Sequence, residues 1–150
     1  MARLIPQPLY KKIVEVIPIP CIDVAARYKG KLLLLKRKDK PLKDQWCFPG
    51  GRIHKNESFK EAAKRKLNEE TNLNFKFIKL FGPYETMFPD ALFGVKTGTH
   101  TINTLALVEV SDIHHLKLDK SHSESKLFSK IDKNWHPYVR KALKDCNFFK

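Results

Sequence analysis

Residues 50–73 read GGRIHKNESFKEAAKRKLNEETNL, in which a double glycine precedes a long run without glycine or proline. Residues 57–71 are rich in Ala, Leu, Lys and Glu, which favour helix, so we expect a helix there with Asn56 as its N-cap. Pro49 and the two glycines break the chain just before it. This stretch therefore predicts a turn with accessible backbone that leads directly into a helix.

Glu70 occupies an unusual position on this expected helix. At about 100° per residue, one apolar face would carry Phe59, Ala63 and Leu67. Glu70 falls within that face and Glu69 at its border, although a carboxylate on a core face is costly unless it is paired or bound to a cation. A pair with Lys66 four residues earlier, or a helix end that reaches solvent, would each account for Glu70. Adjacent carboxylates beside a Gly-Gly turn also suit Mg²⁺ or Mn²⁺ holding a diphosphate.

Apolar, β-rich segments on both sides of this helix predict a sheet. Strands are expected at residues 18–26, 31–36, 74–81, 99–110 and 127–128, with a short apolar piece at 46–48 and a second helix at 135–146. Residues 89–98 read as a long loop. No linker divides the chain, so a single domain over residues 1–150 is expected. The order of the elements predicts an α/β (α+β) fold, a mixed β-sheet with helices on its faces.

The spacing within this stretch resembles the Nudix box, G-x5-E-x7-R-E-U-x-E-E-x-G-U, where U is aliphatic. The matching residues are Gly51, Glu57, Arg65, Leu67, Glu69, Glu70 and Leu73. Asn72 replaces the second glycine, a mild change because Asn tolerates the left-handed conformation at a helix end. Lys66 replaces a glutamate that serves as general base or metal ligand in several Nudix pyrophosphatases. A charged lysine can take neither role, so either hydrolysis is lost or the base lies elsewhere.

Further segments resemble the GDP-mannose mannosyl hydrolase branch of the Nudix superfamily, which relocates its base. They are Asp23, Leu33–Arg37, Trp46, Phe48–Arg52, Thr99–His100 and Asp119–Phe128. The resemblance implies the Nudix fold, a mixed β-sheet sandwiched between α-helices. It also implies a metal-dependent reaction in which water attacks C1 of the sugar, so that GDP and free sugar leave.

The same resemblance assigns roles to individual residues. The implied ligands of Mg²⁺, or of Mn²⁺, are Glu70, Glu69 and the Gly50 carbonyl. His122, in a polar loop, is the implied general base, and histidine suits that role because its ordinary pKa is near neutral. Asp23 would contact the sugar, while the diphosphate would meet Arg37, Arg52 and Arg65, of which Arg65 is grouped with His122 as catalytic. Ser121 stands where the family has a metal-binding glutamine.

The charge of the chain raises a different class of function. The sequence holds 29 Lys and Arg against 16 Asp and Glu, a net charge of +13, which suggests a polyanionic partner. We find no aromatic ladder, helix-turn-helix or zinc pattern, so no specific nucleic acid is expected and most of the lysine is assigned to solvation. The alternatives are a Nudix pyrophosphatase that cleaves at phosphorus, and a nucleotide- or nucleic-acid-binding protein without catalysis.

Composition and resemblance together indicate the cellular location, the partner and the oligomeric state to be expected. Three cysteines without CxxC spacing favour a reducing cytosol, and a cytoplasmic location is expected. No apolar run is long enough to span a bilayer, so no membrane partner is expected. The partner would be a nucleotide sugar. The branch is commonly dimeric, so a homodimer is expected, with the Pro-rich segment before residue 18 as a candidate contributor to the interface.

Overall fold

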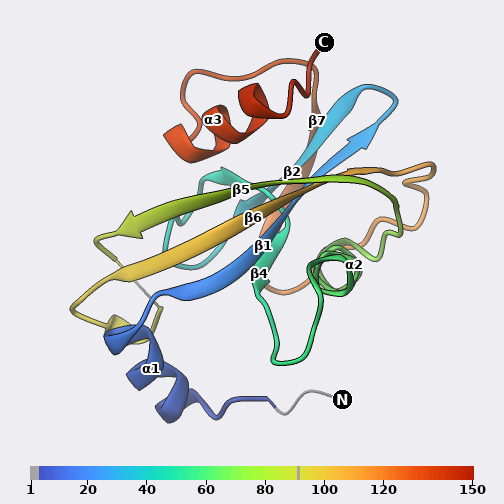
Figure 1. Ribbon diagram of the computed structural model, residues 1–150. Coiled ribbons are helices and arrows are strands. Elements are labelled where there is room, and N and C mark those ends of the chain that lie inside the picture. The colour runs from blue at the N-terminus through green and yellow to red at the C-terminus, as the bar shows by residue number, and fades with distance from the viewer. Residues whose placement is uncertain (1–3, 91) are drawn as a thin grey trace.

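The computed structural model describes residues 4–90 and 92–150 and consists of a mixed sheet between two helices (Figure 1). In chain order the elements are α1 (Gln7–Val16), β1 (Ile19–Tyr28), β2 (Lys31–Arg37), β3 (Trp46–Cys47), β4 (Gly50–Arg52), α2 (Phe59–Thr71), β5 (Lys76–Phe88), the 3₁₀ helix η1 (Leu92–Gly94), β6 (Thr99–Glu109), β7 (His122–Phe128) and α3 (Pro137–Asp145). The strand order is β3-β2-β1-β6-β5, with β4 paired to β1 and β7 paired to β2. β1 and β6 run parallel and the other pairs antiparallel, which confirms the expected fold class.

Two apolar cores lie on opposite faces of the sheet. The first packs under α2 and includes Ile22, Val24, Leu33, Leu35, Leu67, Ala106 and Val108. The second packs under α3 and includes Ala25, Leu32, Leu34, Leu105, Leu107, Val139 and Leu143. Because β2 is covered on both faces, all four leucines of Leu32–Leu35 are buried, as a continuous apolar run predicts.

The start of α2 differs from the sequence prediction. Its N-cap is Ser58, not Asn56, because Ser58 and Glu61 form a reciprocal capping box. Asn56 instead occupies the preceding turn with a positive φ of 66°. Phe59, expected on the core face, is 46% exposed, since the late start of the helix leaves it at the solvent edge. Asn72 ends the helix in the left-handed conformation, as expected.

Three other elements differ from prediction. β5 extends to Phe88, beyond the expected end at residue 81, because β6 pairs with it along its whole length across an irregularity between Phe81 and Tyr84. β7 begins at His122 rather than at Leu127, since its polar residues pair with the apolar β2. The Pro-rich N-terminal segment forms α1, which lies against the β5–β6 connection (Figure 1). Within the described residues, none of the helices has the length and apolar character needed to cross a bilayer.

Candidate active site

Glu70 is buried at the end of α2, with only 5% of its surface exposed. The Gly50 N–H donates to its Oε2 at 2.8 Å, and Lys66 Nζ lies 3.5 Å from its Oε1. Burial raises the pKa of Glu70, while Lys66, His122 and the Gly50 N–H oppose that rise. The expected pair between Glu70 and Lys66 is therefore confirmed, whereas the alternative, a helix end at which Glu70 reaches solvent, is wrong because the carboxylate is buried on the core side.

His122 and Asp119 lie beside Glu70. His122 Nδ1 lies 2.7 Å from Asp119 Oδ1, and the imidazole is almost wholly buried. The Asp119 N–H also donates to the carbonyl of Glu70, so the chain before β7 is attached directly to the end of α2. One ligand atom from each of the three side chains lies within 4.8 Å of the other two. His122 was expected in a polar loop; it starts a strand because Arg37 of β2 pairs with it.

This cluster has the donor chemistry of a divalent-cation site. Two carboxylates supply the hard oxygen ligands that Mg²⁺ and Mn²⁺ prefer, and the imidazole is a further first-row metal ligand. Gly50 is well suited to its place beside Glu70, because a side chain there would overlap the Asp23 carboxylate and the Ile22 carbonyl. The sequence did not identify Asp119 as a candidate ligand, because only the fold brings it next to Glu70.

Glu69 and Arg65 lie apart from this cluster. The Glu69 carboxylate is half exposed and pairs with Arg65 at 3.3 Å and Lys66 at 3.4 Å. Arg65 makes a two-pronged pair with Glu57, at 2.6 and 2.8 Å, and donates to the Arg52 carbonyl at 3.0 Å. The Arg65 hydrogen bond lowers the pKa of Glu57 to about 2. In this structure Arg65 therefore joins the β4–α2 loop to the helix, and it is not among the cavity-lining residues.

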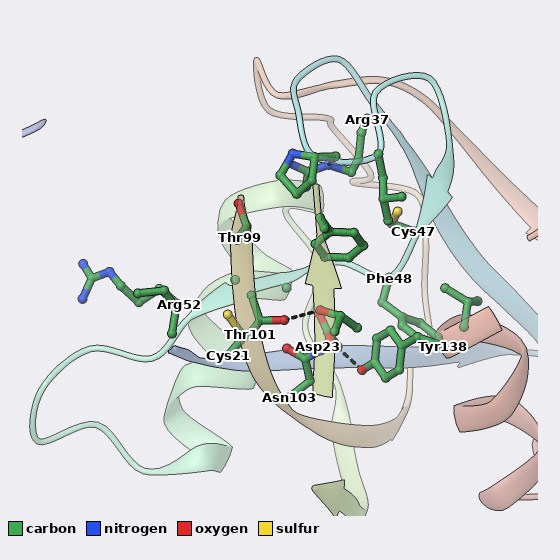
Figure 2. A pocket seen from close by; sticks show the side chains of 18 of the residues that line it. Cys21, Asp23, Arg37, Cys47, Phe48, Arg52, Thr99, Thr101, Asn103 and Tyr138 are labelled. Carbon is green, nitrogen blue, oxygen red and sulfur yellow. Dashed lines mark hydrogen bonds between the residues drawn. The ribbon is translucent and has the colours of Figure 1, made fainter. Parts of the chain in front are cut away.

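A cavity of about 230 Å³ opens next to Gly50 and contains the three predicted substrate-binding residues (Figure 2). Asp23, Arg37 and Arg52 all line it. Tyr138 of α3 donates its hydroxyl to Asp23 Oδ2 at 2.6 Å. Burial raises the pKa of Asp23 to about 7, opposed by the Tyr138 hydrogen bond. Arg37 Nε donates to the Pro41 carbonyl at 2.7 Å, and Arg52 points away from Asp23 (Figure 2).

A polar wall of this cavity was missed by sequence reasoning. It consists of Thr86 on β5 and Thr99, Thr101 and Asn103 on β6. Thr86 and Thr101 share a hydrogen bond between their hydroxyls. Alternation places Thr99, Thr101 and Asn103 on the same side of β6 as the apolar Leu105 and Leu107. The change along this face of β6, from polar residues at 99–103 to apolar residues at 105–107, could have predicted the polar wall from the sequence.

The two glycines were expected in a turn, but they begin strand β4 because they pair with β1. This glycine pair, the helix with a buried terminal carboxylate and the mixed sheet correspond to a known family. The NUDIX domain matches residues 20–145, most of the chain. The chain belongs to the Nudix family. Hydrolysis, assisted by a divalent metal, is the class of reaction that this family membership supports, and the Glu70–Asp119–His122 cluster is a candidate metal site within the Nudix domain.

The proteins to which this Nudix chain is similar carry names that refer to different activities. It is 29% identical over 139 residues, 93% of this chain and 88% of the relative, to the low-salt glycan biosynthesis protein Agl8 of Haloferax volcanii. It is 36% identical over 69 residues to the ADP-ribose pyrophosphatase of Methanocaldococcus jannaschii, covering 46% of this chain and 41% of the relative. The MutT Nudix hydrolase from Burkholderia pseudomallei has the same fold, with a TM-score of 0.70, 22% identity, and coverage of 85% of this chain and 97% of that one.

Proposed function

We propose that this protein is a metal-dependent hydrolase of a nucleotide sugar, with GDP-mannose or GDP-glucose as the leading substrates. In the proposed reaction water attacks C1 of the sugar, the bond from C1 to the diphosphate oxygen breaks, and GDP and free sugar leave. One observation carries the proposal: a buried histidine, His122, is held by Asp119 directly beside Glu70.

The hydrogen bond to Asp119 prepares His122 to act as a base. In the proposed tautomer the imidazole carries its proton on Nδ1 and donates that N–H to the Asp119 carboxylate, which leaves its lone pair on Nε2. His122 Nε2 would then take the proton of the attacking water as the new C–O bond forms. Asp119 would stabilise the imidazolium, as a carboxylate does wherever it orients a catalytic histidine.

The leaving diphosphate requires compensation for its negative charge. Arg37 and Arg52, both at the cavity, are the proposed contacts, because guanidinium groups bind phosphate oxygens in a forked geometry. Glu70 and Asp119, with the Gly50 carbonyl, are the proposed holders of the cation. When bound, a divalent cation would neutralise the charge that develops on the leaving diphosphate.

Lys66 favours cleavage at carbon over cleavage at phosphorus. It occupies the position of a Nudix glutamate and lies 3.4 Å from Glu69 and 3.5 Å from Glu70. A lysine engaged by two carboxylates supplies no base beside the helix, which leaves His122 as the proposed one. The similarity to a protein named for glycan biosynthesis also supports a sugar-bearing substrate.

A Nudix pyrophosphatase is the second candidate. Glu69 is half exposed and lies in the last turn of α2 next to Glu70, so a rotamer change would free it from Arg65 to assist attack at phosphorus. The relative named ADP-ribose pyrophosphatase supports this reading. Its products would be a nucleoside monophosphate and a sugar phosphate.

The deciding experiment incubates the protein with GDP-mannose and Mg²⁺ or Mn²⁺ in ¹⁸O-labelled water and identifies the products by mass spectrometry. GDP with ¹⁸O in free mannose is expected. GMP and mannose 1-phosphate would refute cleavage at carbon and favour the pyrophosphatase. No turnover of any nucleotide sugar, combined with oligonucleotide affinity that falls steeply with salt, would favour the non-catalytic binder.

Compartment and assembly form part of the same proposal. The three cysteines are free, which is compatible with a reducing cytoplasm. A homodimer is proposed on the resemblance and on the exposed apolar side chains at the N-terminal end of the chain, Leu4, Leu9 and Val16. Sedimentation analysis of the purified protein tests the dimer directly.

A further inference from the structure

Asn103 is a buried amide that faces the cavity. Its exposed fraction is 4%, and it lines the cavity from β6. Within residues 4–90 and 92–150, its side chain makes no hydrogen bond, unlike the neighbouring Asp23, which accepts one from Tyr138. Figure 2 shows Asn103 beside Asp23 in the cavity wall, with no dashed line reaching its amide.

The position of Asn103 in the sheet makes a polar side chain there unexpected. Cys21 of β1 and Tyr84 of β5 flank it in the two neighbouring strands, and the next residues on the same face of β6, Leu105 and Leu107, are apolar and buried. The Asn103 amide therefore interrupts an apolar stripe at the point where β6 reaches the cavity. An unpaired polar group at the wall of a cavity is characteristic of a ligand-binding position.

The chemistry of the surrounding wall indicates the kind of ligand. A carboxamide offers both donors and an acceptor, the Asp23 carboxylate offers acceptors, and the hydroxyls of Thr86 and Thr101 offer both. A sugar hydroxyl is likewise donor and acceptor at once. The diphosphate, which only accepts, is better served by Arg37 and Arg52.

We propose that Asn103 recognises hydroxyls of the sugar moiety together with Asp23, and that this contact selects nucleotide sugars over bare nucleoside diphosphates. Tyr138 is the positioning residue that holds the Asp23 carboxylate toward the same hydroxyls. This inference rests on the proposed function and names the part of the substrate that the polar wall binds.

The test compares a sugar-bearing ligand with its sugar-free counterpart. KM for GDP-mannose and the inhibition constant of GDP are measured in the same assay for wild type, Asn103→Ala and a control, Ile102→Thr. Ile102 neighbours Asn103 in β6 but is 37% exposed and absent from the cavity lining. Asn103→Ala should raise KM for GDP-mannose by about tenfold, the usual effect of one lost buried hydrogen bond, and leave the GDP constant unchanged. The control should change neither.

A second measurement separates recognition from a structural role. Asn103→Leu should leave the melting temperature of the ligand-free protein within about 2 °C of wild type, because the amide faces the cavity and makes no hydrogen bond to the described protein residues. A lower melting temperature, together with equal losses for GDP-mannose and GDP, would make Asn103 structural and overturn the proposal. Turnover of GDP-mannose with an unchanged KM in Asn103→Ala would overturn this inference alone. Absence of any nucleotide-sugar turnover by wild type would overturn both proposals.

Discussion

His122 Nδ1 and Asp119 Oδ1 lie 2.7 Å apart, and the pair sits against the buried Glu70 at the end of α2. A carboxylate that holds one imidazole nitrogen determines which tautomer is present and where the other nitrogen acts. The proposed base and the proposed metal ligand are therefore direct neighbours, and mutations must distinguish between the two roles.

His122→Gln should lower kcat by about 10²–10⁴-fold, the usual contribution of a general base. The affinity for Mn²⁺, measured by calorimetry, should stay close to that of wild type if His122 acts as the base. His114→Gln is the matched control, since His114 is largely exposed on the surface. A parallel loss of turnover and of Mn²⁺ affinity would assign His122 to the metal instead, and wild-type turnover would remove it from both roles.

Glu70→Gln should weaken Mn²⁺ binding by about tenfold or more, because it removes a charged oxygen ligand from a buried cluster. Glu69→Gln should have a much smaller effect, since Glu69 is half exposed and pairs with Arg65 and Lys66 outside that cluster. Titration calorimetry of both variants gives the comparison. Equal losses would mean that Glu69 moves into the site when metal binds.

Lys66→Met should lower the stability of the metal-free protein, and Mn²⁺ should restore it. Without metal the substitution removes the cationic partner of the buried Glu70, which should cost about 1–3 kcal/mol of unfolding free energy. With Mn²⁺ the loss should be recovered, because a repelling charge has been removed next to the cation. Thermal unfolding with and without Mn²⁺ measures both effects, with the exposed Lys64→Met as control. A loss that Mn²⁺ does not restore would contradict a cation at Glu70.

The Glu57–Arg65 pair should make stability depend on pH in the acid range. The folded-state pKa of Glu57 is lowered to about 2, so its contribution is present above the ordinary pKa of 4.5 and is lost as the pH falls from there toward 2. At pH 7, Glu57→Gln should cost about 2 kcal/mol of unfolding free energy, as expected for a charge-assisted pair that is mostly shielded from solvent. Denaturant unfolding should show the difference shrinking below pH 4.5. A constant difference down to pH 3 would argue against this pair as its source.

Much of the scaffold was predictable because its signals are local. The helical period placed Glu70 on the core side of α2, and the run Leu32–Leu35 predicted a strand covered on both faces; both are confirmed. The expected N-cap was wrong because two candidates, Asn56 and Ser58, stand close together, and only backbone geometry selects the one with a capping box. The polar first part of β7, residues 122–126, escaped prediction, since its pairing with β2 does not depend on its own apolar pattern.

The amino-acid order alone therefore specified the Nudix box and the direction of Glu70, because helix period and motif spacing are properties of neighbouring residues. Tertiary structure alone brought Asp119 and His122 to Glu70, engaged Arg65 with Glu57, and closed a polar wall around Asn103. These contacts join segments far apart in the chain, so they depend on which strands pair and on which sheet face each helix covers.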